Sequence, residues 1–336
     1  MRLPLGLLMS AALCFCANLD PKQGKANAKA AVAPKAGIAV PGIQIPFAKL
    51  KTEATVALPE EAKFLLFAKE LHAVAGGQVA RVDTKTNKSL EAWNAETALC
   101  GGLVNGFGHV WAPACDKKAI LKLDPKTGKA KATLEVGAAS GRLTAAATKD
   151  SVWAITDKKG TLSRIDPAEN NVVAEIRIPT DCNELLYAAG ALWASCPASN
   201  LVLRIDDQLN VVKERLKPVD EPVALAFGEG SLFVLGKKEG KVVQLDPKTN
   251  KVTATVETKV PNATGSLVVN GGTVWLSQAG FPLTKVDWKE GKVVQQFWGE
   301  GSGQLIFAAD TLWLAPAGKK ELLRIDPKRV ALTLAD

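Results

Sequence analysis

Few side chains in this sequence could support acid–base or metal chemistry. Only two histidines are present: His109 stands at the expected start of one strand, and His72 near the end of another. A histidine-based metal or acid–base site needs side chains that converge, and these two are not expected to meet. The sequence also contains no GxSxG, no HExxH and no phosphate-binding glycine loop. We therefore predict no catalytic residue, no metal site and no cofactor, and interpret each histidine as structural.

Polar residues that interrupt apolar segments are the candidate ligand contacts. A charged side chain in such a segment must be paired or hydrated, so Arg142 and Glu184 are the foremost candidates. They could instead pair with each other across neighbouring units, and the sequence leaves both readings open. The full predicted ligand-binding set is Arg142, Thr144, Asn183, Glu184, Glu221 and Gln304.

Four cysteines form two pairs with nearly the same spacing. In each pair the first cysteine lies eleven residues before a tryptophan, and the second lies three or four residues after it. An antiparallel hairpin would bring the two members side by side, so we predict the disulfides Cys100–Cys115 and Cys182–Cys196. Each closes a loop of about 15 residues, which is worth about 3 kcal/mol. Paired cysteines of this kind indicate that the protein resides in an oxidising compartment. The alternatives are four buried free thiols or a metal site.

Lysine pairs recur in the loops of four units and define a candidate basic rim. A ring of such pairs around one opening would attract an anionic ligand through its summed field. The alternative is that they are ordinary solvated loop residues. The pairs are Lys117–Lys118, Lys158–Lys159, Lys237–Lys238 and Lys319–Lys320.

These candidates need elements that bring them together, and a repeat supplies such elements. Seven strand-like segments each end in an aspartate, at intervals of 39 to 42 residues. A period near 40 with strand-like content is typical of β-propeller blades, which cannot bury their apolar faces alone. We predict an all-β chain that forms a seven-bladed β-propeller of four-stranded antiparallel blades. The aspartates are Asp83, Asp124, Asp166, Asp206, Asp246, Asp287 and Asp326.

Residues 223–257 contain the clearest copy of the blade. The apolar segments VALAFG and SLFVLG predict two inner strands, and the alternating KVVQLD and KVTATVE predict two outer strands. The segment DPKTNK favours a tight turn in which the aspartate caps the backbone. The repeated aspartate is therefore interpreted as structural, rather than as a calcium ligand or a catalytic group.

A large aromatic residue recurs in the second strand and predicts a wedge that fills the space between neighbouring blades. A ring of stacking aromatics for a ligand is the alternative. The fifth unit has Phe233 in this place, and the degenerate first unit has Glu70. The tryptophans are Trp111, Trp153, Trp193, Trp275 and Trp313.

Ring closure requires one end of the chain to complete the sheet begun at the other. Residues 49–59, KLKTEATVALP, resemble an outermost strand, and we predict that they join the sheet that contains residues 311–326. The C-terminal VALTLA is the alternative. The predicted organisation is a signal peptide at 1–19, a flexible linker at 20–44 and the propeller at 45–336.

Propeller geometry places the candidate residues. The innermost strand of each blade runs from the upper face to the lower face. Loops that lead into this strand, and loops between the second and third strands, therefore build the upper face. Both predicted disulfides and the lysine pairs then lie on the upper face, near the mouth of the central channel, where we expect a ligand to bind.

The N-terminal sequence and the net charge narrow the choice of cellular compartment and of binding partner. Arg2 followed by an apolar stretch is typical of an export signal, and Cys16 is an alternative lipidation site that would place the protein on a membrane. The formal net charge is +8, of which about +4 remains outside residues 1–35. That balance does not favour duplex nucleic acid. We expect an exported, periplasmic or secreted monomer whose partner is a small anionic ligand or a protein.

The repeated blade sequence also resembles that of a known family. The segments VVQLDPKTNKVTATVE and LSRIDPAENNVVAEIRI are similar to the YVTN-type repeats of exported bacterial propellers, and the resemblance covers residues 45–328. It implies either a YncE-like binding protein or a relative of virginiamycin B lyase, which uses histidines and a glutamate with a divalent metal. No histidine falls in an upper-face loop of a late blade, so the lyase pattern is not carried over. We expect a non-enzymatic binding propeller. The alternative is a lyase- or lactonase-like enzyme that uses channel carboxylates, and only this alternative would require a divalent metal.

Overall fold

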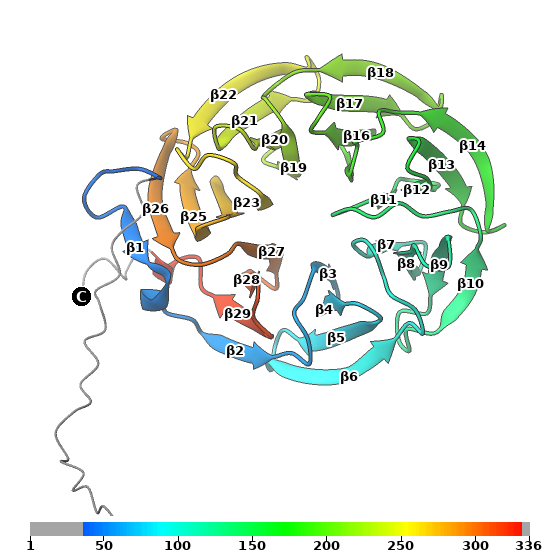
Figure 1. Ribbon diagram of the computed structural model, residues 1–336, viewed down its shortest axis with the longest axis horizontal. Coiled ribbons are helices and arrows are strands. Elements are labelled where there is room, and N and C mark those ends of the chain that lie inside the picture. The colour runs from blue at the N-terminus through cyan, green and yellow to red at the C-terminus, as the bar shows by residue number, and fades with distance from the viewer. Residues whose placement is uncertain (1–35, 331–336) are drawn as a thin grey trace, which may run out of the picture. The chain divides into compact units, whose positions relative to one another are not determined.

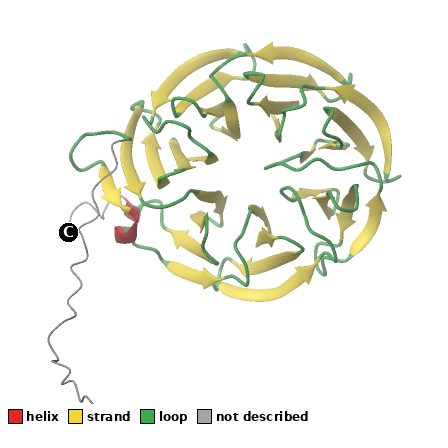
Figure 2. Cartoon of the chain, in the orientation of Figure 1, coloured by secondary structure: helices red, strands yellow, loops and turns green. Residues whose placement is uncertain are grey.

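The computed structural model describes residues 36–330, which consist almost wholly of β-strands (Figure 1; Figure 2). Seven sheets, each with four antiparallel strands, stand around a central axis, and this confirms the predicted seven-bladed β-propeller. Helical structure in this range is limited to the 3-10 turn η1 (Phe47–Lys49) and to 3-10 residues at 329–330. No helix among the described residues is long and apolar enough to cross a membrane. The predicted signal peptide and Cys16 lie outside the described residues.

The blades follow one another along the chain. Blades 1 and 2 consist of β3 (Phe64–Ala68), β4 (Glu70–Ala75), β5 (Gln78–Asp83), β6 (Lys88–Asn94), β7 (Val104–Gly106), β8 (His109–Ala114), β9 (Ala119–Leu123) and β10 (Ala130–Leu134). Blades 3 and 4 consist of β11 (Ala145–Ala147), β12 (Val152–Ile155), β13 (Thr161–Asp166), β14 (Asn171–Arg177), β15 (Glu184–Ala188), β16 (Ala191–Cys196), β17 (Leu201–Asp206) and β18 (Val211–Leu216). Blades 5 and 6 consist of β19 (Pro222–Gly228), β20 (Ser231–Gly236), β21 (Lys241–Asp246), β22 (Lys251–Glu257), β23 (Gly265–Asn270), β24 (Thr273–Gln278), β25 (Phe281–Asp287) and β26 (Lys292–Trp298). Blade 7 consists of β27 (Gly303–Ala308), β28 (Thr311–Pro316), β29 (Glu321–Ile325) and β2 (Ala54–Ala57).

The seven repeated aspartates cap the turn that follows the third strand of their blades. Each carboxylate accepts a hydrogen bond from a backbone N–H two or three residues further on, as Asp246 does from Lys248 at 2.8 Å. Four of these turns continue through an asparagine with positive φ, among them Asn250 at 59°. The interpretation of the aspartates as turn residues is confirmed.

The five predicted tryptophans and Phe233 are all buried between blades, with at most 1% of each side chain exposed. They share one register position, opposite the residue two before the aspartate, as in the pairs Trp193–Arg204 and Trp313–Arg324. In blade 1 this position is taken by His72, opposite Arg81, and the expected Glu70 is wrong. The reason is local: only Gly76 and Gly77 separate β4 from β5, whereas four residues separate β8 from β9.

The two blades that lack a wedge tryptophan recruit another aromatic residue. Trp288, from the β25–β26 turn of blade 6, packs edge-on against Phe233 with ring centroids 4.9 Å apart. Trp93, from the outermost strand of blade 1, lies 4.6 Å from His72. Each recruited ring replaces part of the apolar area that a wedge tryptophan would bury.

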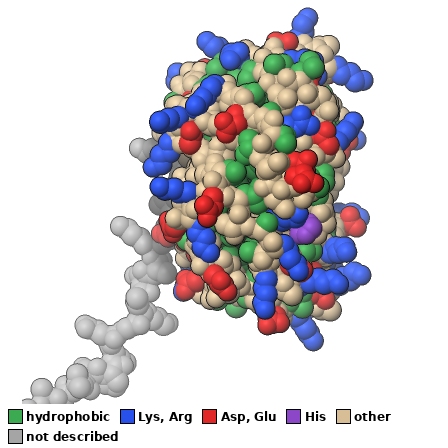
Figure 3. All heavy atoms as spheres, turned by 90° about the vertical axis from the view of Figure 1, so that its right-hand side faces the viewer, with side chains coloured by type: hydrophobic (Ala, Val, Ile, Leu, Met, Phe, Trp, Pro, Cys, Tyr) green, Lys and Arg blue, Asp and Glu red, His purple; other side chains and the backbone are tan. Residues whose placement is uncertain are grey.

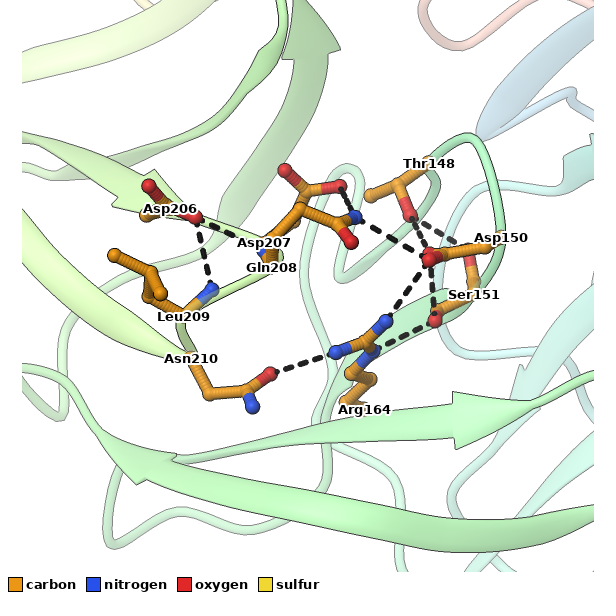
Figure 4. Close-up of polar contacts among 9 residues, drawn as sticks. All are labelled: Thr148, Asp150, Ser151, Arg164, Asp206, Asp207, Gln208, Leu209 and Asn210. Atoms are coloured by element: carbon orange, nitrogen blue, oxygen red, sulfur yellow. Dashed lines mark hydrogen bonds and ion pairs between the residues drawn. The ribbon is translucent and has the colours of Figure 1, made fainter.

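A side-chain bridge ties several blades to the next one. The residue two before the aspartate reaches the turn asparagine of the following blade, in the pairs Lys122–Asn170 (3.0 Å), Arg164–Asn210 (3.1 Å) and Arg324–Asn87 (2.8 Å). Figure 4 shows the bridge between blades 3 and 4, where Arg164 also donates to Ser151 and Asp150. The charged group of such a side chain also lies over its own wedge: the Nζ of Lys122 is 5.5 Å from the ring centre of Trp111.

The ring closes through the N-terminal strand. β2 pairs antiparallel with β29 as the outermost strand of blade 7, from Ala54 opposite Arg324 to Ala57 opposite Glu321. This confirms the predicted closure. An additional strand, β1 (Gln44–Pro46), pairs parallel with β26 and covers the outer edge of blade 6. Residues 36–44 of the predicted linker thus contact the propeller, since the N–H of Ile38 also donates to the side chain of Gln296.

We predict that Val56→Asp lowers the free energy of unfolding by about 3 kcal/mol or more, because it buries an unpaired carboxylate. Val56 is 5% exposed and packs in one cluster with Trp313 and Leu322. Thr55→Asp is the matched control, since the neighbouring Thr55 faces solvent on the same strand. Denaturant unfolding of both variants checks the closure, and equal losses in the two would contradict it.

Acid should weaken the fold partly through Asp206. The hydrogen bond from the Lys213 ammonium group, together with the N–H groups of Leu209 and Gln208, lowers the pKa of Asp206 from 3.8 to about 2. A depressed carboxyl pKa contributes stability that is present above pH 3.8 and is lost as the pH falls toward 2. The Asp206→Asn variant should therefore have a lower melting temperature than the wild type at pH 5. This difference in melting temperature should become smaller between pH 4 and pH 2. A difference in melting temperature that stays constant with pH would contradict a stabilising role for the ionised Asp206 carboxylate.

Candidate functional site

An opening lies at the upper mouth of the central channel. Its volume is about 640 Å³, and its polar lining comes from loops that lead into the innermost strands and from β27. The lining residues include Lys63, Cys100, Ser140, Arg142, Ser302 and Gln304. A second space of about 150 Å³ continues along the channel wall and shares Arg142 and Gln304 with the first, and it is otherwise lined largely by apolar residues. We call this second space the throat; polar and apolar groups line both the mouth and the throat.

The inner loops of blades 2, 3 and 4 are joined by backbone hydrogen bonds. We call residues 100–102, 141–143 and 183–185 the inner collar. Within it the N–H of Gly102 donates to the carbonyl of Arg142 at 3.0 Å, and the N–H of Leu185 donates to the carbonyl of Leu143 at 2.7 Å. A Cβ atom on Gly102 would stand only 2.8 Å from that Arg142 oxygen, so this approach requires glycine.

The two predicted disulfides are present and brace the inner collar. Cys100 is bonded to Cys115 directly after β8, and Cys182 is bonded to Cys196 at the end of β16. Each therefore links the loop that leads into an innermost strand to the end of the second strand of the same blade. Both lie on the upper face. Covalent links and cross-blade hydrogen bonds together hold this half of the channel mouth in one conformation.

Arg142 and Glu184 pair with each other, the second of the two readings that the sequence allowed. The Arg142 guanidinium makes two contacts with the Glu184 carboxylate, one of them from Nε to Oε2 at 2.8 Å. The same carboxylate accepts the N–H of Leu225 from blade 5 at 3.0 Å. Glu184 is completely buried, and this burial raises its pKa while the Arg142 charge opposes the rise. Glu184 thus links blades 3, 4 and 5, whereas the side chain of Arg142 is 20% exposed at the mouth.

The other predicted ligand contacts are distributed around this pair. Gln304 lines the mouth, as expected. Thr144 is 1% exposed, and neither its hydroxyl nor the side-chain oxygen of Asn183 has a hydrogen-bond partner among the described residues. Glu221 is not among the residues that line the mouth or the throat; it forms an ion pair with Lys237 at 3.5 Å.

The lysine pairs occupy the predicted upper-face loops, but they are not equivalent. Lys237, Lys238 and Lys320 form ion pairs with Glu221, Asp220 and Glu60. No ion pair is formed within residues 36–330 by Lys117, Lys118, Lys158, Lys159 or Lys319. In Figure 3, Lys and Arg side chains project at both edges of the ring as viewed from its side, so basic character is not confined to one face.

Several residues of the mouth were not predicted from the sequence. Lys63, Ser140, Thr264 and Ser302 all line it. Lys63, Thr264 and Ser302 each stand directly before the innermost strand of their blade. Counting back from the repeated aspartate to that strand start would have found them. Polar residues are common in loops, so their presence there did not point to a site.

Metal-ligating and acid–base side chains do not converge at the mouth in the part of the chain that the structure describes. Among the described residues, no group of three or more His, Cys, Asp and Glu side chains could hold a metal ion. The one buried carboxylate at the channel is engaged by a guanidinium and by a backbone N–H, so its oxygens are already occupied by donors. His109 lies at the start of β8 and contacts the carbonyl of Phe107, away from the residues of the mouth.

We predict that Glu184→Ala lowers the free energy of unfolding by about 3 to 5 kcal/mol, because Arg142 then loses its partner and the Leu225 N–H its acceptor. The double variant Arg142→Gln with Glu184→Gln keeps amide hydrogen bonds and removes both charges, so it should cost less than the single change. Urea unfolding measures both. Equal stability of Glu184→Ala and the wild type would show that the pair does not tie the blades.

Comparison with known proteins supports the fold and does not extend to a family. No protein-family model matches the sequence, and no curated protein sequence matches it. Among solved structures, the crystal structure of BamB from Moraxella catarrhalis is similar, with a TM-score of 0.59 and 13% sequence identity, over 82% of this chain and 99% of that chain. At that identity the likeness concerns the fold alone: this chain is a seven-bladed β-propeller similar in structure to BamB.

Proposed function

We propose that this protein is a non-enzymatic binding propeller that takes its partner at the upper mouth of the channel. One observation carries the proposal: the opening of about 640 Å³ presents polar groups, and on the side of blades 2 and 3 these stand on loops whose backbone is held by a disulfide and by the inner collar. Pockets of this size are typical of ligand sites. A preformed site also binds more tightly, because little conformational entropy is lost on association.

The charge around the mouth favours an anionic ligand or an acidic protein segment. Unpaired lysines concentrate over blades 2 and 3, at Lys117, Lys118, Lys158 and Lys159. Asp116 and Asp157 offset part of this charge, whereas the corresponding lysines of blade 5 are neutralised by ion pairs. The inner collar residues of these same two blades bear Arg142 at the edge of the opening. A ligand anion would therefore lie over blades 2 and 3.

The enzyme alternative finds less support in the geometry. Its carboxylates were Glu184 and Glu221, and they lie in different surroundings, one fully buried against Arg142 and the other in an ion pair with Lys237. A general base must be free to take a proton from its substrate. Neither carboxylate presents a free oxygen at the mouth.

The family and the cellular location of the protein are also part of the proposal. The repeats resemble YVTN-type, YncE-like propellers, and we propose that relationship together with export to the periplasm or the medium. Two disulfides in one chain fit an oxidising compartment. Cleavage after the signal, rather than lipidation at Cys16, and a monomeric state complete the proposal.

A thermal-shift screen with citrate, tripolyphosphate and poly-glutamate tests the binding site. We expect at least one of these anions to raise the melting temperature by several degrees at about 100-fold excess over its Kd, and to do so less at high salt. Ser140→Trp, an exposed position at the mouth, should abolish the shift by blocking the opening.

Ser89→Trp is the matched control for this screen, because Ser89 is an exposed serine on the outermost strand β6. It should leave the shift unchanged. An equal shift in Ser140→Trp and the wild type would place the site elsewhere. If none of the anions shifts the wild type, the anionic ligand is ruled out for this panel and a protein partner becomes the remaining form of the proposal.

A further inference from the structure

A second pocket lies on the opposite, lower face, between blades 1 and 2. Its volume is about 450 Å³, within the range of small-molecule sites. Its walls come from the β3–β4 and β7–β8 hairpins and from the aspartate turn of blade 2. The lining residues used below are Lys69, Glu70, His72, Arg81, Phe107 and Lys126.

This pocket exists because blade 1 departs from the repeat in two ways. The wedge position holds His72, which is smaller than the tryptophan of five other blades. The first hairpin is also shorter: only Lys69 separates the paired residues Ala68 and Glu70, whereas two residues separate the corresponding pair Gly106 and His109 in blade 2. Both changes remove side-chain and backbone volume from the same part of the interface.

The bridge between blades is also missing at this interface. Arg81 stands where Lys122 and Arg324 stand in their blades, but it does not reach the next turn. Its side chain bonds instead to Glu70 at 2.6 Å and to the carbonyl of Glu91, both within blade 1. Among residues 36–330, the side-chain hydrogen bond that blade 1 makes to the turn of blade 2 comes from Trp93, whose indole N–H donates to the carbonyl of Lys126 at 3.3 Å. The space that an arginine or lysine fills elsewhere therefore stays open.

His72 lines this space with unused hydrogen-bonding capacity. The residue is 2% exposed, and although the backbone of Leu66 and Glu70 lies near its ring, neither ring nitrogen makes a hydrogen bond of acceptable geometry with the described residues. Burial lowers the pKa of His72, so the neutral ring offers one donor and one acceptor. A buried polar side chain without a partner is costly in a folded protein, and a bound ligand would satisfy it.

The remaining lining defines the chemistry of the ligand. Phe107 is 38% exposed at the pocket, on a hairpin turn with a φ of 56°, where a bulky side chain is unusual. It supplies an apolar surface together with Val110 and Pro125. Lys69, Lys126 and Arg81 carry three positive charges against the single negative charge of Glu70. The lining thus combines an apolar surface with a net positive rim.

We propose that this pocket is a second binding site, specific for a small aromatic anion, whose ring packs against Phe107 and whose anionic group is held by Lys69 and Lys126 and accepts a hydrogen bond from the ring N–H of His72. The site is independent of the channel mouth. It lies at the other end of the blades, and it shares no lining residue with the mouth.

Isothermal titration with 2-naphthoate as the probe tests the proposal, with uncharged 2-naphthylmethanol as the ligand control. We expect the wild type to bind the carboxylate more tightly than the alcohol. His72→Phe should weaken binding about tenfold by removing the ring nitrogens, a loss equal to about 1.4 kcal/mol. The fold tolerates phenylalanine at this register position, as Phe233 demonstrates in blade 5. His72→Trp restores the wedge of the repeat and should abolish binding.

Lys126→Ala has a matched control in Lys248→Ala, because both lysines follow a proline at the same place in the aspartate turn of their blades. The first should weaken binding about two- to fivefold, and the second should not change it. Melting curves of each variant establish that it is folded. Unchanged affinity in folded His72→Phe and Lys126→Ala, or no binding of 2-naphthoate by the wild type at about 1 mM, the upper end of weak ligand affinity, would overturn the proposal. Such a result would leave the channel-mouth proposal intact, since Ser140→Trp tests that site separately.

Discussion

The structure depends on one packing requirement: a four-stranded sheet that is apolar on both faces must be covered on both faces. In this chain one large residue per blade, such as Trp153 or Trp193 at 0% exposure, packs at the centre of a cluster of smaller apolar residues that fills the space between blades. Because each wedge packs against a neighbouring blade, no blade can be complete until the ring is closed. The strand β2 supplies that closure by joining the N-terminal part of the chain to blade 7. The loops, in contrast, carry little of the packing and are free to differ between blades.

Much of the architecture follows from the sequence because it rests on local chemistry repeated seven times. The aspartate turn needs only its own backbone, so its period of about 40 residues predicts the blades directly. The disulfides were predictable for a related reason. Cys100–Cys115 and Cys182–Cys196 occupy equivalent places around a wedge tryptophan, so the pairing in one blade supports the pairing in the other.

What the sequence could not provide are relations between residues of different blades. The wedge of blade 1 was misplaced by two residues, because counting from Asp83 assumes a hairpin of standard length and the Gly76–Gly77 turn is shorter. The pairing of Arg142 with Glu184 required a choice between solvent and a neighbouring blade, and 42 residues of chain separate them. Likewise, the pocket at His72 arises from volume that is absent, and absent volume leaves no positive signal in a sequence.

The two candidate sites are built by opposite means. At the upper mouth, glycines, disulfides and the inner collar bring backbone segments closer than side chains would allow, so the opening is rigid and its specificity comes from the residues at its edge. At the lower pocket, a shortened hairpin and a small wedge residue leave a space inside an otherwise closed interface.

Glu184 illustrates what the close packing at the upper mouth requires of a charged side chain. Burying a carboxylate is costly, and here the cost is met by a guanidinium and a backbone N–H from two other blades. A carboxylate held by three donors is fixed in place, and both of its oxygens already accept hydrogen bonds within the protein. The contacts that make it a good link between blades 3, 4 and 5 therefore leave neither oxygen free for a substrate. This is the reason for proposing that the upper mouth binds a partner.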